Sequence, residues 1–159
     1  MPRIRTDQPS SGRPLQLLIS AGGFVPATFT TLAEAPDFSV PSTGNDGTVD
    51  PAASDRELRP GEVFIETPLA CTNTDTAARW VELQILTAGG HAVPVTPQVA
   101  IPPKETLYLP IQGLRLLKTD FAAANGDRLQ IRASTNAAIK IFGSASELEA
   151  QSHAPDTEA

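Results

Sequence analysis

The sequence predicts an all-β protein built as a single antiparallel β-sandwich. Segments such as Arg79–Leu86 and Arg128–Ser134 alternate apolar and polar residues, which is the period of a half-buried strand. Turn-forming pairs, Gly89-Gly90 and Asn125-Gly126, separate segments of this kind. A chain of 159 residues is long enough for one such domain with extensions.

The expected strands begin after Gly61, where the composition changes. A strand-like run covers Glu62–Leu69 and continues past Pro68 into Ala70–Asn73, and the proline indicates a sheet edge or a bulge. Arg79–Leu86 is the clearest strand, with Val81 and its alternate neighbours on one face and Trp80 on the other.

The second half continues as short extended segments that prolines and turns delimit. Leu114–Leu117 is ambiguous between a strand and a helical turn. The other expected segments are His91–Thr96, Gln98–Ile101, Thr106–Ile111, Arg128–Ser134 and Ala138–Gly143. In total the pattern predicts about seven or eight strands over residues 61–146, as in a jelly-roll or immunoglobulin-like sandwich.

Residues 1–60 are expected to form an extended, proline-rich N-terminal arm, because they hold eight of the fifteen prolines. Residues 41–48 are the best candidate for a hinge or exposed loop. The arm also carries large apolar side chains that gain free energy by leaving water, so it either folds back on its own domain or binds neighbouring subunits. The candidate partner-binding residues are Leu15, Leu17, Leu18, Ile19, Phe24, Phe29 and Phe38.

Charge excludes some classes of partner. The net charge is −6, and the last thirteen residues, 147–159, hold four acidic and no basic side chains, which predicts a flexible acidic tail. An acidic chain disfavours binding to nucleic acid and to anionic membranes. No apolar run reaches the ~20 residues that span a bilayer, and the apolar run after Pro14 is too short for a signal peptide.

No set of residues matches a catalytic, cofactor or metal motif, so we expect a protein that is not an enzyme and needs no cofactor. His91, His153 and Cys71 are too few nitrogen and sulfur donors for a zinc site. Nucleophile-elbow and phosphate-loop motifs are missing from the sequence. Trp80 and Tyr108 are candidates for a sugar-stacking surface, although aromatic residues of a sandwich more often contribute packing.

The order of four segments resembles that of a known group of proteins. The segments are Cys71–Thr74 before the strand Arg79–Leu86, then Ile101–Pro110, then Asn125–Ser134, and finally Ile139–Gly143. This series of strand, polar turn and strand resembles small β-sandwich structural proteins of tailed bacteriophages. The resemblance covers about half of the chain and excludes the N-terminal arm.

The resemblance implies a virion structural protein, assembled in the bacterial cytoplasm and located in the virion. Its partners are then other virion structural proteins and further copies of itself in a symmetric assembly, bound through the arm, at the head, neck, tail or fibre. The alternative is an adhesive or carbohydrate-binding module on a virion or cell surface, for which Trp80 or Tyr108 would supply the platform.

Overall fold

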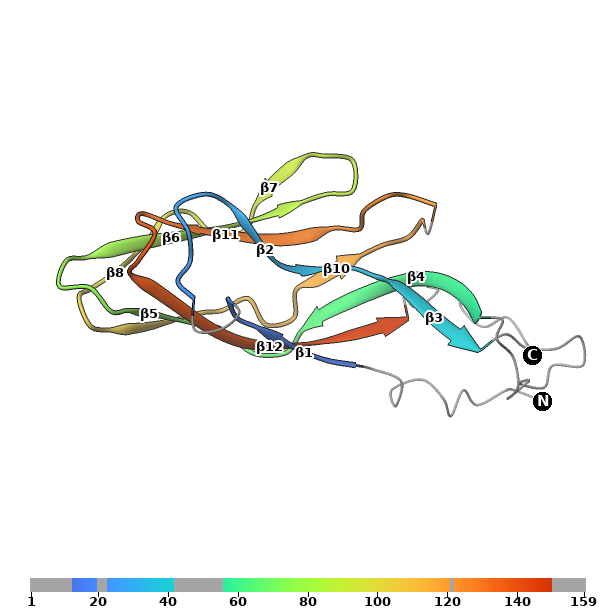
Figure 1. The fold of residues 1–159 in the computed structure, drawn as a ribbon, viewed down its shortest axis with the longest axis horizontal. Helices are drawn as coiled ribbons and strands as arrows, with labels where there is room; N and C mark the ends of the chain where they lie inside the picture. The colour runs from blue at the N-terminus through green and yellow to red at the C-terminus, as the bar shows by residue number, and fades with distance from the viewer. Residues whose placement is uncertain (1–12, 20–22, 42–55, 121, 150–159) are drawn as a thin grey trace, which may run out of the picture.

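The computed structural model describes residues 13–19, 23–41, 56–120 and 122–149. Within these ranges the chain forms twelve strands and no helix, arranged as two antiparallel sheets that pack together (Figure 1). The predicted all-β sandwich is therefore confirmed. The number of strands predicted for residues 61–146, about seven or eight, was slightly too low, because the structure has nine there, β4 to β12, three of which are only three residues long. Three more strands, β1 to β3, lie in the segment expected as an arm.

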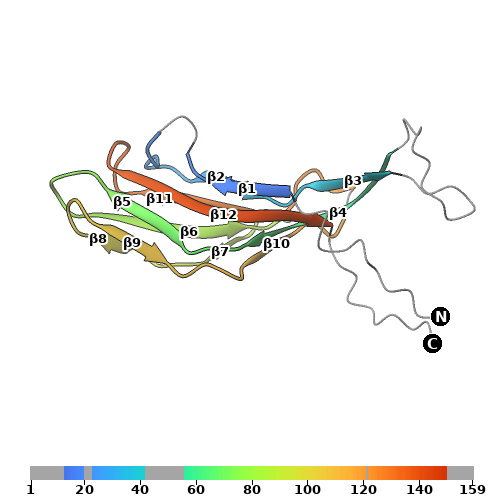
Figure 2. The same cartoon turned by 90° about the horizontal axis from the view of Figure 1, so that it is seen from below.

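The larger sheet has seven strands and is organised around its longest one, β12 (Ile139–Glu149). One end of β12 pairs with β5 and the other with β4, while β1 pairs with residues 143–147 (Figure 2). Strand β9 pairs with β5, and β10 and β3 pair with β4. The bounds are β1 (Arg13–Leu17), β3 (Asp37–Pro41), β4 (Arg56–Ile65), β5 (Leu69–Asn73), β9 (Thr106–Leu109) and β10 (Arg115–Leu117).

The smaller sheet has five strands, and β11 and β6 form its centre. Strand β11 pairs with β2 on one side and with β6 on the other, and β6 also pairs with the short strands β7 and β8. The bounds are β2 (Thr30–Glu34), β6 (Arg79–Leu86), β7 (Ala92–Pro94), β8 (Val99–Ile101) and β11 (Arg128–Ala133). Figure 1 shows the hairpin of β6 and β7 projecting from the body of the molecule.

Most strands predicted after Gly61 are present. Strand β6 has the predicted bounds, and the ambiguous segment Leu114–Leu117 contains the strand β10. Strand β12 runs six residues beyond the predicted Gly143, so residues 147–149, expected in the acidic tail, belong to the sheet. Pairing explains this extension, because β1 and β4 both hydrogen-bond to this part of β12. Residues 150–159 of the expected tail lie outside the described residues.

The segment expected as an extended arm contributes to both sheets. Strands β1 and β3 join the larger sheet and β2 joins the smaller one. Its prolines fit this arrangement, since Pro14 lies in β1, which pairs only with β12, and Pro41 is the last residue of β3. A proline at an edge or a strand end sacrifices no ladder hydrogen bond. Residues 42–48 of the expected hinge lie outside the described residues.

The hydrophobic core lies between the inner faces of the two sheets. Leu17 and Val25 from the N-terminal segment are fully buried there, together with Ile65 and Ile139 of the larger sheet and Leu129 of the smaller one. The backbone N–H of Val25 also donates to the carbonyl of Ile139 at 2.8 Å. The described part of the N-terminal segment, residues 13–19 and 23–41, thus contributes to the same core as the predicted sandwich.

Two glycines make room for the segment that connects the smaller sheet to the larger one. Residues Ala35 and Pro36 connect β2 of the smaller sheet to β3 of the larger one. A Cβ atom on Gly61 would lie 2.1 Å from the carbonyl oxygen of Pro36, and one on Gly126 would lie 2.3 Å from that of Ala35. Only glycine leaves room for the crossing backbone at these two positions.

We predict that Gly61→Ala lowers the free energy of unfolding by about 1–3 kcal/mol or more, because the new methyl group would overlap rigid backbone rather than a flexible side chain. Gly89→Ala is the matched control. Its Cβ would meet only ordinary contacts, the nearest at 3.5 Å, so the expected change is within about 0.5 kcal/mol. Urea denaturation followed by circular dichroism measures both, and equal stabilities would contradict the crossing geometry.

A second prediction concerns the N-terminal segment. Leu17→Ala removes a fully buried side chain and is expected to cost about 2–5 kcal/mol of unfolding free energy. Its exposed neighbour Gln16 serves as control, and Gln16→Ala should change stability by less than about 0.5 kcal/mol. If thermal melts show Leu17→Ala to be as stable as the unchanged protein, β1 is not integral to the fold.

Candidate functional site

The residues considered for catalysis and metal binding are separated in the structure. Cys71 is fully buried on β5, and burial raises the pKa of its thiol to about 12. His91 lies in the exposed turn between β6 and β7. Among the described residues, no three His, Cys, Asp or Glu side chains gather as a metal site would require. The same part of the chain contains no helix that could cross a membrane.

The acidic side chains of the turns have structural partners. Asp75, in the turn between β5 and β6, accepts a hydrogen bond from Nε of Arg79 at 2.7 Å and another from the backbone N–H of Thr76. These hydrogen bonds, that from Arg79 first, lower the pKa of the exposed Asp75 carboxyl below its usual value. Asp127 accepts hydrogen bonds from the backbone N–H groups of Ala88 and Leu117, each at 3.3 Å, and so connects its own turn to the loop after β6 and to the end of β10.

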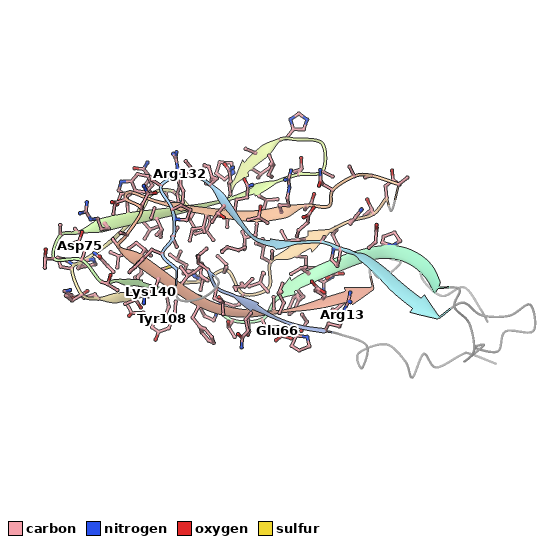
Figure 3. The ribbon with its side chains drawn as sticks, viewed as in Figure 1. Arg13, Glu66, Asp75, Tyr108, Arg132 and Lys140 are labelled. Carbon is pink, nitrogen blue, oxygen red and sulfur yellow. The ribbon has the colours of Figure 1, made fainter. Side chains whose placement is uncertain are left out.

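The two candidate sugar-stacking residues lie on opposite outer faces of the sandwich. Trp80 lies on β6 of the smaller sheet, next to the inward-facing Val81. Tyr108 lies on β9 of the larger sheet, next to the inward-facing Leu109, and is 67% exposed. Figure 3 shows Tyr108 on the lower side of the molecule and Arg132, which contacts Trp80, on the upper side. One ligand cannot use both rings.

Trp80 is engaged by its own sheet. The guanidinium group of Arg132 lies 5.7 Å from the centre of the Trp80 ring and 4.7 Å from that of Phe29, so it stacks between the two. Arg132 also pairs with the carboxylate of Glu82 on the neighbouring strand. Next to this cluster, Gln84 donates to Gln130 at 2.9 Å. The side chains around Trp80 are therefore already paired with one another across the strands.

The seven candidate partner-binding residues do not form one surface. Leu17 is buried, and Leu15 and Ile19 pack against the core. Leu18 is half-buried, and Phe38 lies on β3. The two remaining phenylalanines contact different sheets. Phe29 stacks on Arg132 of the smaller sheet, and Phe24 contacts Lys140 of the larger one.

The structure brings together a set of residues of which the sequence analysis singled out only Tyr108. Phe142 of β12 pairs with Ala70 of β5, and Ala70 pairs in turn with Tyr108 of β9. In the adjacent row, Lys140 pairs with Thr72 and Thr72 with Thr106, whose hydroxyl is 2.8 Å from that of Thr72. All six side chains lie on the outer face, because Leu69 and Cys71 between them point into the core. We call these six residues the outer-face platform.

The outer-face platform combines exposed aromatic rings with one positive charge. Tyr108 and Phe142 are 67% and 58% exposed, and among the side chains whose exposure the structure describes, Val93 on the other sheet is the only further exposed large apolar one. The ammonium group of Lys140 lies 5.1 Å from the centre of the Phe24 ring. No carboxylate of the described residues pairs with Lys140, so the cation is held by an aromatic ring and its charge stays available.

Sequence reasoning missed Phe142, although one signal was available. The alternation in Ala138–Gly143 already assigns Lys140 and Phe142 to the face opposite Ile139 and Ile141. The register that aligns β12, β5 and β9 in one row is not local, since these strands are far apart in the sequence. The exposure of Phe142 and its proximity to Tyr108 therefore depend on pairing that the local pattern does not contain.

Comparison with known proteins adds no relative to this description. No family model matches the chain, and neither a curated protein nor a solved structure matches it. The residues and geometry described above are therefore the basis of any functional conclusion.

The environment of Cys71 generates a chemical prediction. A thiol with a pKa raised to about 12 is almost entirely protonated at pH 8, and its burial also blocks access of reagents. We expect the native protein to react with a disulfide reagent such as DTNB only as fast as it unfolds. In denaturing urea one thiol per chain should react within the mixing time. Fast stoichiometric labelling of the native protein would contradict this.

Proposed function

We propose that this chain is a virion structural protein of a tailed bacteriophage, a β-sandwich that binds neighbouring virion proteins and catalyses no reaction. The order of strands from Glu62 to Ser146, on which the resemblance depends, supports this proposal. One structural observation carries it further. The first residue of β1, the last residue of β12 and the paired ends of β3 and β4 lie at the same end of the larger sheet, as expected of a subunit attached at one end.

The strand pairings bring these strand ends together. Arg13, the first residue of β1, pairs with Glu147 near the end of β12, and Glu149 pairs with Gly61. From Gly61, strand β4 extends back to Arg56, which pairs with Pro41 at the end of β3. These strand ends therefore lie together at one end of the larger sheet, which we call the exit end. Figure 3 shows Asp75 at the opposite end from Arg13.

A subunit with this polarity can be attached at the exit end and expose the rest of the sandwich. Because Leu17 is fully buried in the core and Leu15 and Ile19 pack against it, we assign the anchoring contacts to the part of the segment that precedes β1. The proposed partners are other virion structural proteins and further copies of this chain, assembled in the bacterial cytoplasm. Symmetric repetition strengthens such attachment, because each copy adds the same contact.

The test is a deletion of residues 1–12 in a phage or prophage that encodes this protein. The cut ends there because a deletion up to residue 40 would also remove β1, β2 and most of β3. The truncated protein should keep its β-sheet circular dichroism and melting temperature, and its amount in gradient-purified particles should fall at least tenfold.

A deletion of residues 152–159 serves as a matched control for shortening the chain at the same end. Normal incorporation of the protein without residues 1–12 would refute anchoring by the N-terminal segment. If the full-length protein is not found in purified particles, the virion role itself is refuted.

A further inference from the structure

We propose that the outer-face platform binds an acidic oligosaccharide, that is, one with a carboxylate-bearing sugar such as a uronic acid. The proposal goes beyond the virion role and does not depend on it, since it follows from one surface of the folded chain. It also differs from a site built on Trp80, which is occupied by Arg132 on the other face.

The first argument is the spacing of the two rings. Phe142 and Tyr108 are separated by one strand, so their backbones are about 10 Å apart. Between them lies Ala70, whose single methyl group leaves the space between the rings open. A flat, extended ligand can thus contact both rings at once. Pyranose rings fit, because each has an apolar face of C–H groups that packs against an aromatic ring.

The second argument is the polar row beside the rings. The hydroxyl groups of Thr72 and Thr106 lie 2.8 Å apart on the same outer face, and hydroxyls both donate and accept hydrogen bonds. A chain of sugar units offers hydroxyl groups along its edge while its rings stack. Small-molecule sites typically combine an apolar contact surface with a small number of polar groups that point toward the ligand.

The third argument is charge complementarity. Lys140 lies in the polar row, next to Phe142 on the same strand and face, and its described partner is the ring of Phe24. A cation–π contact neutralises no charge, so a ligand carboxylate gains a charge-assisted hydrogen bond there without displacing a protein carboxylate. A neutral oligosaccharide would leave this interaction unused.

Other classes of ligand fit the surface less well. A stable protein interface buries roughly 800 Å² on each partner around several apolar anchors, whereas the platform offers two large exposed apolar side chains, Tyr108 and Phe142. Nucleic acids and anionic membranes are bound through several basic residues, and Lys140 is a single one in a chain of net charge −6.

The experiment titrates the full-length protein with oligogalacturonate and oligomannuronate, and with neutral glucan oligomers of the same length, by calorimetry. We expect binding to an acidic oligomer, weakened at least tenfold by Lys140→Gln, with little effect of that substitution on any neutral oligomer. Tyr108→Ala and Phe142→Ala should each weaken binding of acidic and neutral oligomers alike, by about tenfold. Higher salt should weaken only the acidic ones.

Val93→Ala is the matched control, because Val93 is an exposed apolar residue of the other sheet, and it should leave binding unchanged. The proposal is overturned if no oligomer binds, or if the Tyr108 and Phe142 variants bind as the unchanged protein does. Equal binding of acidic and neutral oligomers would refute the carboxylate contact. Self-association that Tyr108→Ala abolishes would identify a second copy as the occupant instead. Incorporation into particles is a separate measurement, so failure here leaves the virion proposal standing.

Discussion

The hydrogen-bond ladder of β12 is the interaction on which the rest of the structure depends. This strand of eleven residues pairs with β1, β4 and β5, and so joins segments from the beginning, middle and end of the described chain. Gly143 lies at its centre, where a Cβ would be only 3.3–3.4 Å from atoms of Leu17 and Leu69. Because glycine has no side chain, Leu17 of β1 and Leu69 of β5 can both pack close to the backbone of β12 at this position.

The two sheets are connected at both ends. At one end, Ala35 and Pro36 cross from one sheet to the other in close contact with Gly61 and Gly126. At the other end the buried side-chain amide of Asn73 donates to the carbonyl of Ile101, which belongs to β8 of the smaller sheet, at 3.0 Å. A satisfied buried amide fixes one arrangement of the loops, because any shift would leave it unpaired in a dry interior. The sandwich is therefore a rigid support for its surfaces.

The alternation of apolar and polar residues was sufficient to predict the class of fold. Which strands lie next to each other depends on long-range pairing, which the local sequence does not show. Alternation identified β6 and β11, because each has an apolar face against the core. The same reasoning did not find the strands of residues 13–41, where prolines suggested an extended arm, since β1 and β2 form their hydrogen bonds with strands more than ninety residues away. Of the two possibilities left open for the arm, these residues follow the one in which it folds back on its own domain. The outer-face platform could be predicted only in part for the same reason. The alternation in Ala138–Gly143 is sufficient to place Phe142 and Lys140 on one face, but not in the neighbourhood of Tyr108.

The position of the platform along β12 supports a division of the molecule into an attached end and a displayed face. Lys140 is the second residue of β12 and Glu149 the last, so about 30 Å of strand separate these two residues. Glu147, at the exit end, forms an ion pair with Arg13 at 3.4 Å. It lies seven positions after Lys140 on β12, so the acidic residues of this strand are distant from Lys140. Since surface charges are screened over about 8 Å at physiological ionic strength, these acids do not offset the charge of Lys140. The charge of Lys140 and the proposed attachment at the exit end therefore lie at different positions along one strand.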